Sequence, residues 1–376
     1  MERRRDGETK RRSDCGGRES GLGRGLEPYG GLGIAGGYDA GMLRILHVGV
    51  GPLGHRILNE FVERKLGRIV AAVDSHPNIA GTTLSKLVTG VSPELKVLPS
   101  LGEFKDWGEV DAAIVTTSSD LRMCEPTFRD ILAHGKAIVS TCEELLYPWL
   151  RHKVLADRLH AEAVKTGGRL LGTGVNPGFL MDALPTFVTG VCRSVRAVRV
   201  YRIQDASSRR VPFQKKIGAG LDLAQFDKKV AEGTLRHVGL GESIHFLSRY
   251  LGIPIERWEE DIAPVKADRE LISALGPIHR GMVAGVRQVA KGYADEQCVI
   301  HLEFQAAIGQ ADPHDRCVID GQPPVDLVIP GGVHGDAATS AITLNALPRI
   351  MEAAPGLHTM ATISPIRVVQ GGAGRD

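Results

Sequence analysis

The sequence is poor in aromatic residues and has almost no net charge. Aromatic residues make up 5% of its 376 residues, and the formal net charge is +2. Lys and Arg are scattered beyond the N-terminal segment, with little aromatic interleaving, so we expect no nucleic acid partner. No uninterrupted apolar run reaches the roughly 18 residues that a membrane span needs, so we also expect no membrane partner.

The six cysteines are too far apart to form a CxxC pair or a disulfide framework. Such spacing is typical of reduced thiols and favours a cytoplasmic location. His, Asp and Cys residues do not have the spacing of metal ligands, so we predict no metal.

Residues 1–41 are rich in Arg and then in Gly, with almost no large apolar residue. Such a segment buries too little surface to offset its ordering entropy, which predicts a disordered N-terminal extension. It also lacks the apolar region of a secretory signal.

In residues 42–175, apolar strands alternate with helical patterns. The runs "LRILHVGV", "RIVAAVD", "DAAIVTTS" and "KAIVST" predict strands, and "PLGHRILNEFVERK" has apolar residues at helical spacing. This alternation is typical of a parallel sheet with helices on both faces.

The first strand leads into "VGVGPLG", which places Gly49, Gly51 and Gly54 in GxGxxG spacing. A strand before this motif and a helix after it are the context of a dinucleotide-binding site. We therefore predict an α/β fold with a Rossmann-type domain, whose loop, including Pro52 and Leu53, faces the cofactor phosphates.

An acidic residue is expected about 20 positions after the last glycine, and Asp74 ends the second strand there. A carboxylate at this place favours NAD, but Ser75 and His76 follow and leave NADP open. Ligands of open parallel sheets bind beyond the carboxyl ends of the strands. We therefore expect small polar residues at other strand ends to line the cofactor: Thr116, Thr117, Ser118, Thr141 and Cys142.

Residues 176–332 predict a second domain of α+β type, because several strand-like runs follow one another with turn signals between them. They include "VRAVRVYRI", "GMVAGVRQVA", "CVIHLEFQAAI" and "PPVDLVIP", with helical patterns among them. Residues 333–376 contain a last helix, "GDAATSAITLNALPRIMEA", which we expect to return to the Rossmann domain.

Glu143 and Glu144 follow directly on a strand end beside the expected nicotinamide position. A carboxylate there can act as an acid or base, or stabilise an iminium ion. The residues alone leave a second interpretation, in which both are acidic residues favoured at a helix N-terminus. Only one of two adjacent side chains is expected to face the substrate.

A loop after a strand offers Asn176 as a candidate for both the cofactor site and the substrate pocket, and Pro177 and Phe179 as further candidates for the pocket. Arg202 and Gln204 share one strand face, which either holds a substrate carboxylate or faces solvent. The cluster "RRVPFQKK" is either a solvated face or an anion site. Asp336 is predicted to N-cap the last helix, which leaves His334 and Thr339 for the pocket.

Five stretches resemble the family of 2,4-diaminopentanoate dehydrogenase and native NAD(P)H-dependent amine dehydrogenases. They are "GVGPLG", "STCEELLYPWL", "GTGVNPGFLMDALP", "DASSRRVPFQKKIGAG" and "GGVHGDAATSAITLNALPRI". The resemblance implies a dihydrodipicolinate-reductase-like dinucleotide domain and an α+β substrate domain that forms a homodimer. It also implies Glu143 as the key catalytic residue, with Glu144 as the second choice.

The function implied is an NAD(P)-dependent amine dehydrogenase, which interconverts an amine with a ketone or aldehyde plus ammonia. Within it, 2,4-diaminopentanoate dehydrogenase itself is one alternative. A dihydrodipicolinate-type cyclic imine reductase is another, but its E-x-H-H-x-x-K-x-D stretch is absent. A dinucleotide sensor without turnover is a third.

Overall fold

The computed structural model describes residues 43–371 and contains two large sheets. The first has seven parallel strands in the order β15-β6-β5-β4-β1-β2-β3. The order 3-2-1-4-5-6 within it is that of a Rossmann fold, as predicted. Its strands are β1 Leu43–Val48, β2 Gly67–Val73, β3 Val97–Leu98, β4 Ala112–Val115, β5 Ala137–Ser140, β6 Arg169–Gly172 and β15 Gly356–His358.

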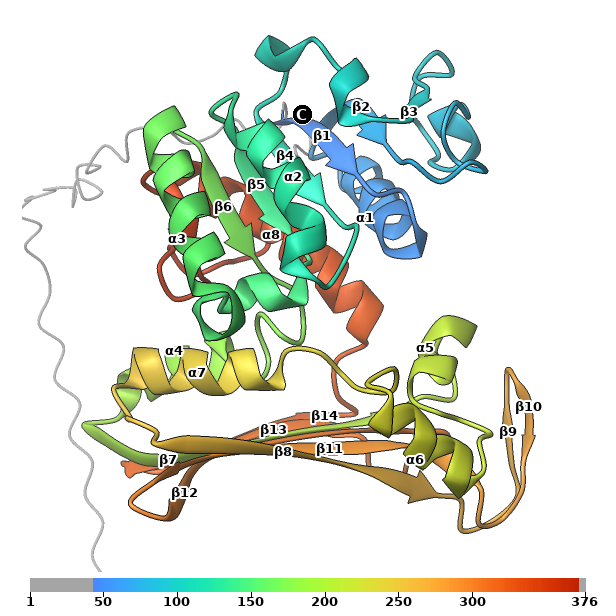
Figure 1. The fold of residues 1–376 in the computed structure, drawn as a ribbon, viewed down its shortest axis with the longest axis vertical. Helices are drawn as coiled ribbons and strands as arrows, with labels where there is room; N and C mark the ends of the chain where they lie inside the picture. The colour runs from blue at the N-terminus through green and yellow to red at the C-terminus, as the bar shows by residue number, and fades with distance from the viewer. Residues whose placement is uncertain (1–42, 372–376) are drawn as a thin grey trace, which may run out of the picture. The chain divides into compact units, whose positions relative to one another are not determined.

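Two pairs of helices cover this sheet, one pair on each face (Figure 1). Successive strand residues point to opposite faces, so Ile45 packs with α1 and α8 while Leu46 packs with α2 and α3. Helix α8, the last helix of the chain, contacts α1 and β5 of this part. The helices are α1 Pro52–Glu63, α2 Leu121–Leu132, α3 Trp149–Thr166 and α8 Gly335–Glu352.

The second sheet has the order β14-β13-β7-β12-β11-β8 and is mainly antiparallel, since only β7 and β12 pair in parallel. Its strands are β7 Ser194–Asp205, β8 Arg257–Lys266, β11 Val283–Ala294, β12 Gln297–Ala307, β13 His314–Gln322 and β14 Val325–Pro330. A small hairpin joins β9 Leu271–Ser273 to β10 Gly276–Ile278.

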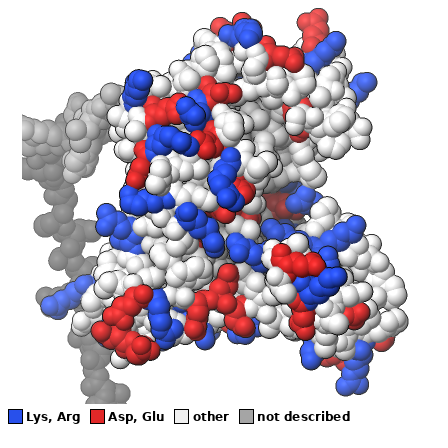
Figure 2. All heavy atoms as spheres, in the orientation of Figure 1, with Lys and Arg blue, Asp and Glu red and all other residues white. Residues whose placement is uncertain are grey.

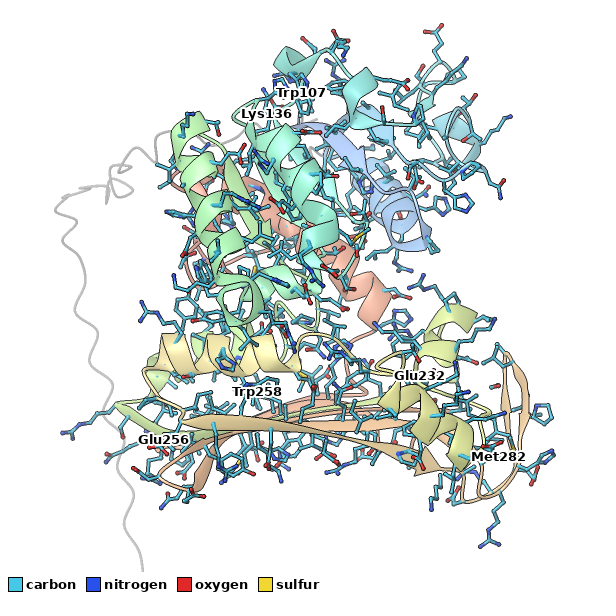
Figure 3. The ribbon with its side chains drawn as sticks, viewed as in Figure 1. Trp107, Lys136, Glu232, Glu256, Trp258 and Met282 are labelled. Atoms are coloured by element: carbon cyan, nitrogen blue, oxygen red, sulfur yellow. The ribbon has the colours of Figure 1, made fainter. Side chains whose placement is uncertain are left out.

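Helix α7, Leu240–Leu251, lies between the two sheets. It contacts β8, β11 and β12 on one side, and α3 on the other. Trp258 of β8 packs under α7 against His245, with ring centroids 5.7 Å apart (Figure 3). The remaining helices of this part are α4 Ala183–Val188, α5 Val211–Lys216 and α6 Leu223–Ala231.

Short 3-10 helices complete the elements: η1 Leu84–Lys86, η2 Leu101–Glu103, η3 Trp107–Glu109, η4 Glu143–Leu146 and η5 Thr189–Val191. Helix η4 follows β5 directly and contacts α7. No helix in the described range 43–371 is long and apolar enough to span a membrane. The extension expected for residues 1–41 lies outside that range.

A buried ion pair joins two strands of the second sheet. Arg202 of β7 lies opposite Asp315 of β13 and is 2% exposed, with Nη1 2.8 Å from Asp315 Oδ1. The second oxygen, Oδ2, accepts the backbone N–H of Val333 at 2.7 Å. The interpretation that Arg202 and Gln204 form a solvated face is wrong, since Gln204 is 8% exposed.

We expect Asp315→Ala to destabilise the protein by about 3–5 kcal/mol, because it leaves the Arg202 guanidinium buried without a counter-charge. The matched control is Asp326→Ala, which removes the exposed Arg316–Asp326 pair of the same sheet and should cost only about 0–1 kcal/mol. Chemical denaturation of both variants measures the difference. Equal losses would contradict a structural role for the buried pair.

Candidate functional site

Two cavities adjoin the glycine-rich loop between β1 and α1. The strand-end cavity, of about 750 Å³, lies at the carboxyl ends of β1, β2 and β4. The charged pocket, of about 250 Å³, lies between the Rossmann sheet and the second sheet. The loop separates them, since Gly51 and Pro52 line the first cavity and Leu53 lines the second.

The three glycines of the loop have different surroundings. Gly49 has a φ of +95°, which disfavours any side chain. A Cβ on Gly54 would lie 1.9 Å from the carbonyl oxygen of Gly49, whereas a Cβ on Gly51 would meet no atom within 4 Å. The open space at Gly51 faces the strand-end cavity, which fits the close approach of a pyrophosphate.

Asp74 connects the end of β2 to this loop. Its Oδ2 accepts the backbone N–H of Val50 at 2.6 Å, and its Oδ1 accepts that of His76 at 2.8 Å. Each carboxylate oxygen has a second lone pair left for a ligand hydroxyl. The predicted cofactor residues that line the strand-end cavity are Gly49, Gly51, Pro52, Asp74, Ser75, His76, Thr116 and Thr117.

Three predicted cofactor residues, Gly54, Ser118 and Cys142, line neither cavity. Gly54 lies against the backbone of the loop. The Ser118 hydroxyl accepts the backbone N–H of Asp120 at 3.1 Å just before α2. The Cys142 side chain is buried, and its thiol donates to the carbonyl of Ser119 at 3.3 Å. Both therefore serve the packing of α2 against η4. Thr141 and Asn176 line the charged pocket instead.

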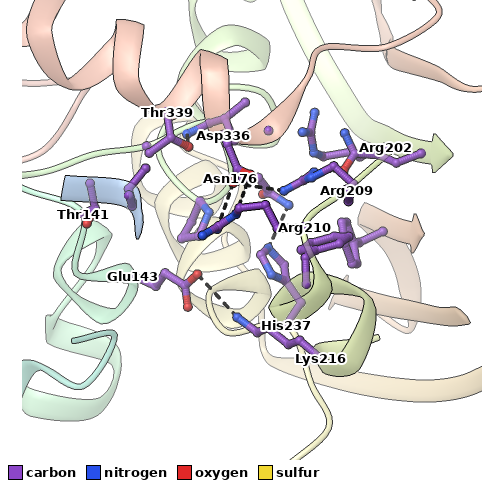
Figure 4. Close-up of a pocket in the computed structure, with 18 of the residues that line it drawn as sticks. Thr141, Glu143, Asn176, Arg202, Arg209, Arg210, Lys216, His237, Asp336 and Thr339 are labelled. Atoms are coloured by element: carbon purple, nitrogen blue, oxygen red, sulfur yellow. Dashed lines mark hydrogen bonds and ion pairs between the residues drawn. The ribbon is translucent and has the colours of Figure 1, made fainter. Parts of the chain in front are cut away.

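The carboxylate of Glu143 points into the charged pocket from the first residue of η4 (Figure 4). Its side chain is 20% exposed, and Oε1 lies 3.9 Å from Nζ of Lys216 on α5. Its Oε2 is buried without a hydrogen-bond partner among the described residues. Burial raises the pKa of Glu143, while the nearby Lys216 charge opposes the rise.

Glu144 turns away from the pocket. Its Oε2 accepts the backbone N–H of Leu121, the first residue of α2, and lies 2.9 Å from Nε2 of His152. The carboxylate of Asp120 lies close to this pair. Each of the three residues Asp120, Glu144 and His152 therefore offers a possible metal-ligand atom, and these atoms lie within 4.8 Å of one another. Because Arg122 also pairs with Asp120, protein donors already satisfy these oxygens, and the group gives no argument for a metal.

His237 and Asn176 form a neutral pair at the pocket wall. Nδ2 of Asn176 donates to Nε2 of His237 at 2.9 Å, and the imidazole stacks on Phe304 with centroids 4.5 Å apart. Burial lowers the pKa of His237 well below its usual value, so the ring stays uncharged. The Oδ1 atom of Asn176 is buried and has no partner among the described residues, which makes it available to a ligand.

The N-terminus of α8 carries a carboxylate that binds two guanidinium groups. Asp336 Oδ1 lies 3.2 Å from Nη2 of Arg209, and Oδ2 lies 2.8 Å from Nε of Arg210. The N-cap of α8 is His334, not Asp336 as predicted. The "RRVPFQKK" cluster is thus not only a solvated face, because Arg209, Arg210 and Lys216 line the charged pocket.

Five of the seven predicted pocket residues line the charged pocket: Asn176, Pro177, Arg202, Gln204 and Thr339. Phe179 instead packs between the apolar clusters of the two sheets. His334 is exposed and caps α8. Sequence reasoning missed His237, Phe213 and Phe304 as lining residues, since an isolated His or Phe gives no local signal of a pocket.

Residues 179–375 match the family described as the 2,4-diaminopentanoate dehydrogenase C-terminal domain. The chain belongs to this family. The family match includes Arg202, Lys216 and Thr339, whereas Glu143 and the glycine loop lie before it. The resemblance seen in the sequence is thereby confirmed.

Known relatives cover most of the chain. The 2,4-diaminopentanoate dehydrogenase of Acetoanaerobium sticklandii is 26% identical over 337 residues, which are 88% of this chain and 95% of that protein. An amine dehydrogenase of Streptomyces virginiae is 23% identical over 290 residues, 70% of this chain and 80% of that one. The structure of the amine dehydrogenase from Mycobacterium smegmatis shares the fold, with a TM-score of 0.76, 22% identity, and coverage of 89% of this chain and 100% of that chain.

The different surroundings of Gly54 and Gly51 predict opposite effects of alanine. We expect Gly54→Ala to cost about 1–3 kcal/mol or more, because its Cβ would collide with the backbone of the loop. Gly51→Ala should change stability by less than about 0.5 kcal/mol, since its Cβ enters open space. Denaturation curves of the two variants decide the matter, and similar losses would refute the packing assigned to this loop.

Proposed function

We propose that this chain is an NAD(P)-dependent amine dehydrogenase, which interconverts an amine with a ketone or aldehyde plus ammonia. Membership of the 2,4-diaminopentanoate dehydrogenase family and the two related dehydrogenases support the proposal. The observation that carries it is the carboxylate of Glu143, which points into a pocket beside a dinucleotide-binding loop. Such a carboxylate suits a reaction in which positive charge develops on the substrate nitrogen.

When bound, a nicotinamide cofactor supplies hydride exchange at the substrate carbon. The residues of this chain provide the rest of the proposed mechanism. Amide groups at the start of α1 bind the pyrophosphate, and Asp74 binds ribose hydroxyls. Glu143 stabilises the iminium nitrogen by its negative charge, and then accepts a proton from the water that attacks the iminium carbon. Asn176 orients the substrate through its free Oδ1 atom.

The charges of the pocket favour a substrate that carries a carboxylate besides its amine. Its wall carries more basic than acidic side chains. The basic ones include Arg209, Arg210 and Lys216, and the acidic ones are Glu143 and Asp336. Activity with ammonium and NADH should therefore be compared among 2-amino-4-oxopentanoate, 4-oxopentanoate, cyclohexanone and a short aldehyde. Reduction without any need for ammonium would contradict the amine dehydrogenase and favour another reductase.

We also propose that the chain forms a homodimer through the outer face of the second sheet. Helices α4 and α7 lie on one face of this sheet (Figure 1). Half-buried side chains such as Tyr201, Val299 and His301 belong to the other face. Acidic and basic side chains are interspersed over the visible surface (Figure 2).

The cytoplasmic location stays a prediction from the widely spaced cysteines.

Glu143→Gln should lower ammonium-dependent turnover by about 10²–10⁴-fold, because the amide cannot accept a proton or balance the iminium charge. The control is Glu144→Gln, which alters the contacts of α2 and His152 and should reduce stability more than turnover. Steady-state rates with both variants measure the effect. An active Glu143→Gln enzyme, or an inactive Glu144→Gln enzyme that is fully folded, would exchange the roles of the two residues.

Asp74 should make the enzyme prefer NAD(H). Among the described residues that line the strand-end cavity, none is Lys or Arg, so no permanently positive side chain there offsets the repulsion between Asp74 and a 2′-phosphate. We expect Asp74→Ser to weaken NADH binding about 10–100-fold, the loss of hydrogen bonds to a charged group, and NADPH binding much less. Fluorescence titration gives both dissociation constants, with thermal unfolding as the check on folding. Equal weakening of both cofactors would refute a role in discrimination.

A further inference from the structure

Most of the positive charges in the charged pocket already have structural partners. Arg202 pairs with Asp315, and both Arg209 and Arg210 pair with Asp336. Among the described Lys and Arg residues that line this pocket, Lys216 is the one whose carboxylate partner is Glu143. The partner of Lys216 is thus the proposed catalytic group itself, not a carboxylate that holds the fold together.

The helix that carries Lys216 is firmly attached, while the Lys216 side chain is partly exposed and makes no hydrogen bond to Glu143. Gln214 of α5 is fully buried, donates to the carbonyls of Ala206 and Arg209, and accepts the backbone N–H of Ala274. The backbone position of Lys216 is therefore fixed. Its side chain is 41% exposed and ends 3.9 Å from Glu143 Oε1, too far for a hydrogen bond. This loose contact allows the ammonium group to leave without disturbing α5.

The other groups around Glu143 do not replace this charge. From the segment before α2, Ser119 also lowers the pKa of Glu143, but it carries no charge. From α7, Glu242 adds a negative charge, but Arg151 of α3 pairs with it at 2.8 Å. Arg236, just before α7, acts on Glu143 more weakly than Lys216 does. Lys216 on α5 is thus the main charge that favours an ionised Glu143.

We propose that Lys216 is a positioning residue, which keeps Glu143 ionised in the free enzyme and withdraws when the cationic nitrogen of the substrate takes its place. Two positive groups beside one carboxylate repel each other, and the lysine is the one that can reach solvent. This inference rests on the proposed function, because it needs a substrate whose nitrogen becomes positively charged. Lys216 takes no part in bond making, and acts through Glu143.

The test compares pH profiles for amine oxidation in the wild type, Lys216→Met, Lys216→Arg and Lys215→Met. Lys215 is the preceding residue of α5, is also exposed, and does not line the pocket. The profile of kcat/KM reports ionisations of the free enzyme, whereas that of kcat reports those of the substrate complex. The substrate amine titrates identically in all four enzymes, so differences between them come from the protein.

In Lys216→Met we expect the acidic limb of kcat/KM to move about 1 unit to higher pH, because Glu143 loses its opposite charge. On that limb the variant is then about tenfold less active than the wild type at equal pH. The acidic limb of kcat should stay in place, Lys216→Arg should restore the wild-type profile, and Lys215→Met should match the wild type. Overlapping kcat/KM profiles of Lys216→Met and wild type would overturn the proposal, as would an equal shift in Lys215→Met or in kcat.

A second measurement needs no turnover. In protein labelled with ¹³C at glutamate carboxyl groups, the signal missing from Glu143→Gln identifies Glu143, and its titration is followed by NMR. Titration at higher pH in Lys216→Met than in wild type supports the role of Lys216, and unchanged titration refutes it. The wild type could show this shift and yet have no ammonium-dependent turnover. That result would refute the proposed function but would still support the effect of Lys216 on the ionisation of Glu143.

Discussion

The site depends on a carboxylate that is held largely out of water where β5 ends. Glu143 is fixed there because η4 follows the strand at once and its neighbour Glu144 is bound to the start of α2 and to His152. Burial disfavours the charge of Glu143, so an ionised Glu143 depends on a positive charge nearby. Lys216 reaches it from α5, and the pocket is thus complete only when both parts of the fold are in place.

A second feature is the use of carboxylates to hold arginines in place. Asp315 binds Arg202 within the second sheet, and Asp336 binds Arg209 and Arg210 across to the start of α8. Because α8 packs on the Rossmann sheet beside α1, the Asp336 contacts connect the substrate side of the pocket to the cofactor side. These pairs leave the pocket positive at its wall without leaving a buried charge unpaired.

Features set by local sequence could be predicted, and those set by distant contacts could not. The glycine loop, Asp74 and the strand–helix alternation follow from spacing alone, and all were found where expected. The partner of Arg202 lies 113 residues away, so its burial was invisible in the strand pattern. The choice between Glu143 and Glu144 likewise depends on the α2 N-terminus and His152. The N-cap of α8 was predicted two residues too far along the chain, because the Asp336 carboxylate pairs with Arg209 and Arg210 instead of capping the helix.

The most direct test of the central claim is the fate of the hydride. The protein is incubated with NADH deuterated at C4, in separate samples for the two faces of the ring, together with ammonium and the best carbonyl compound. Mass spectrometry then locates the label. An amine dehydrogenase predicts, for one face, an amine with deuterium on the carbon that bears the new nitrogen. A deuterated alcohol, or labelled product that forms equally without ammonium, would contradict it.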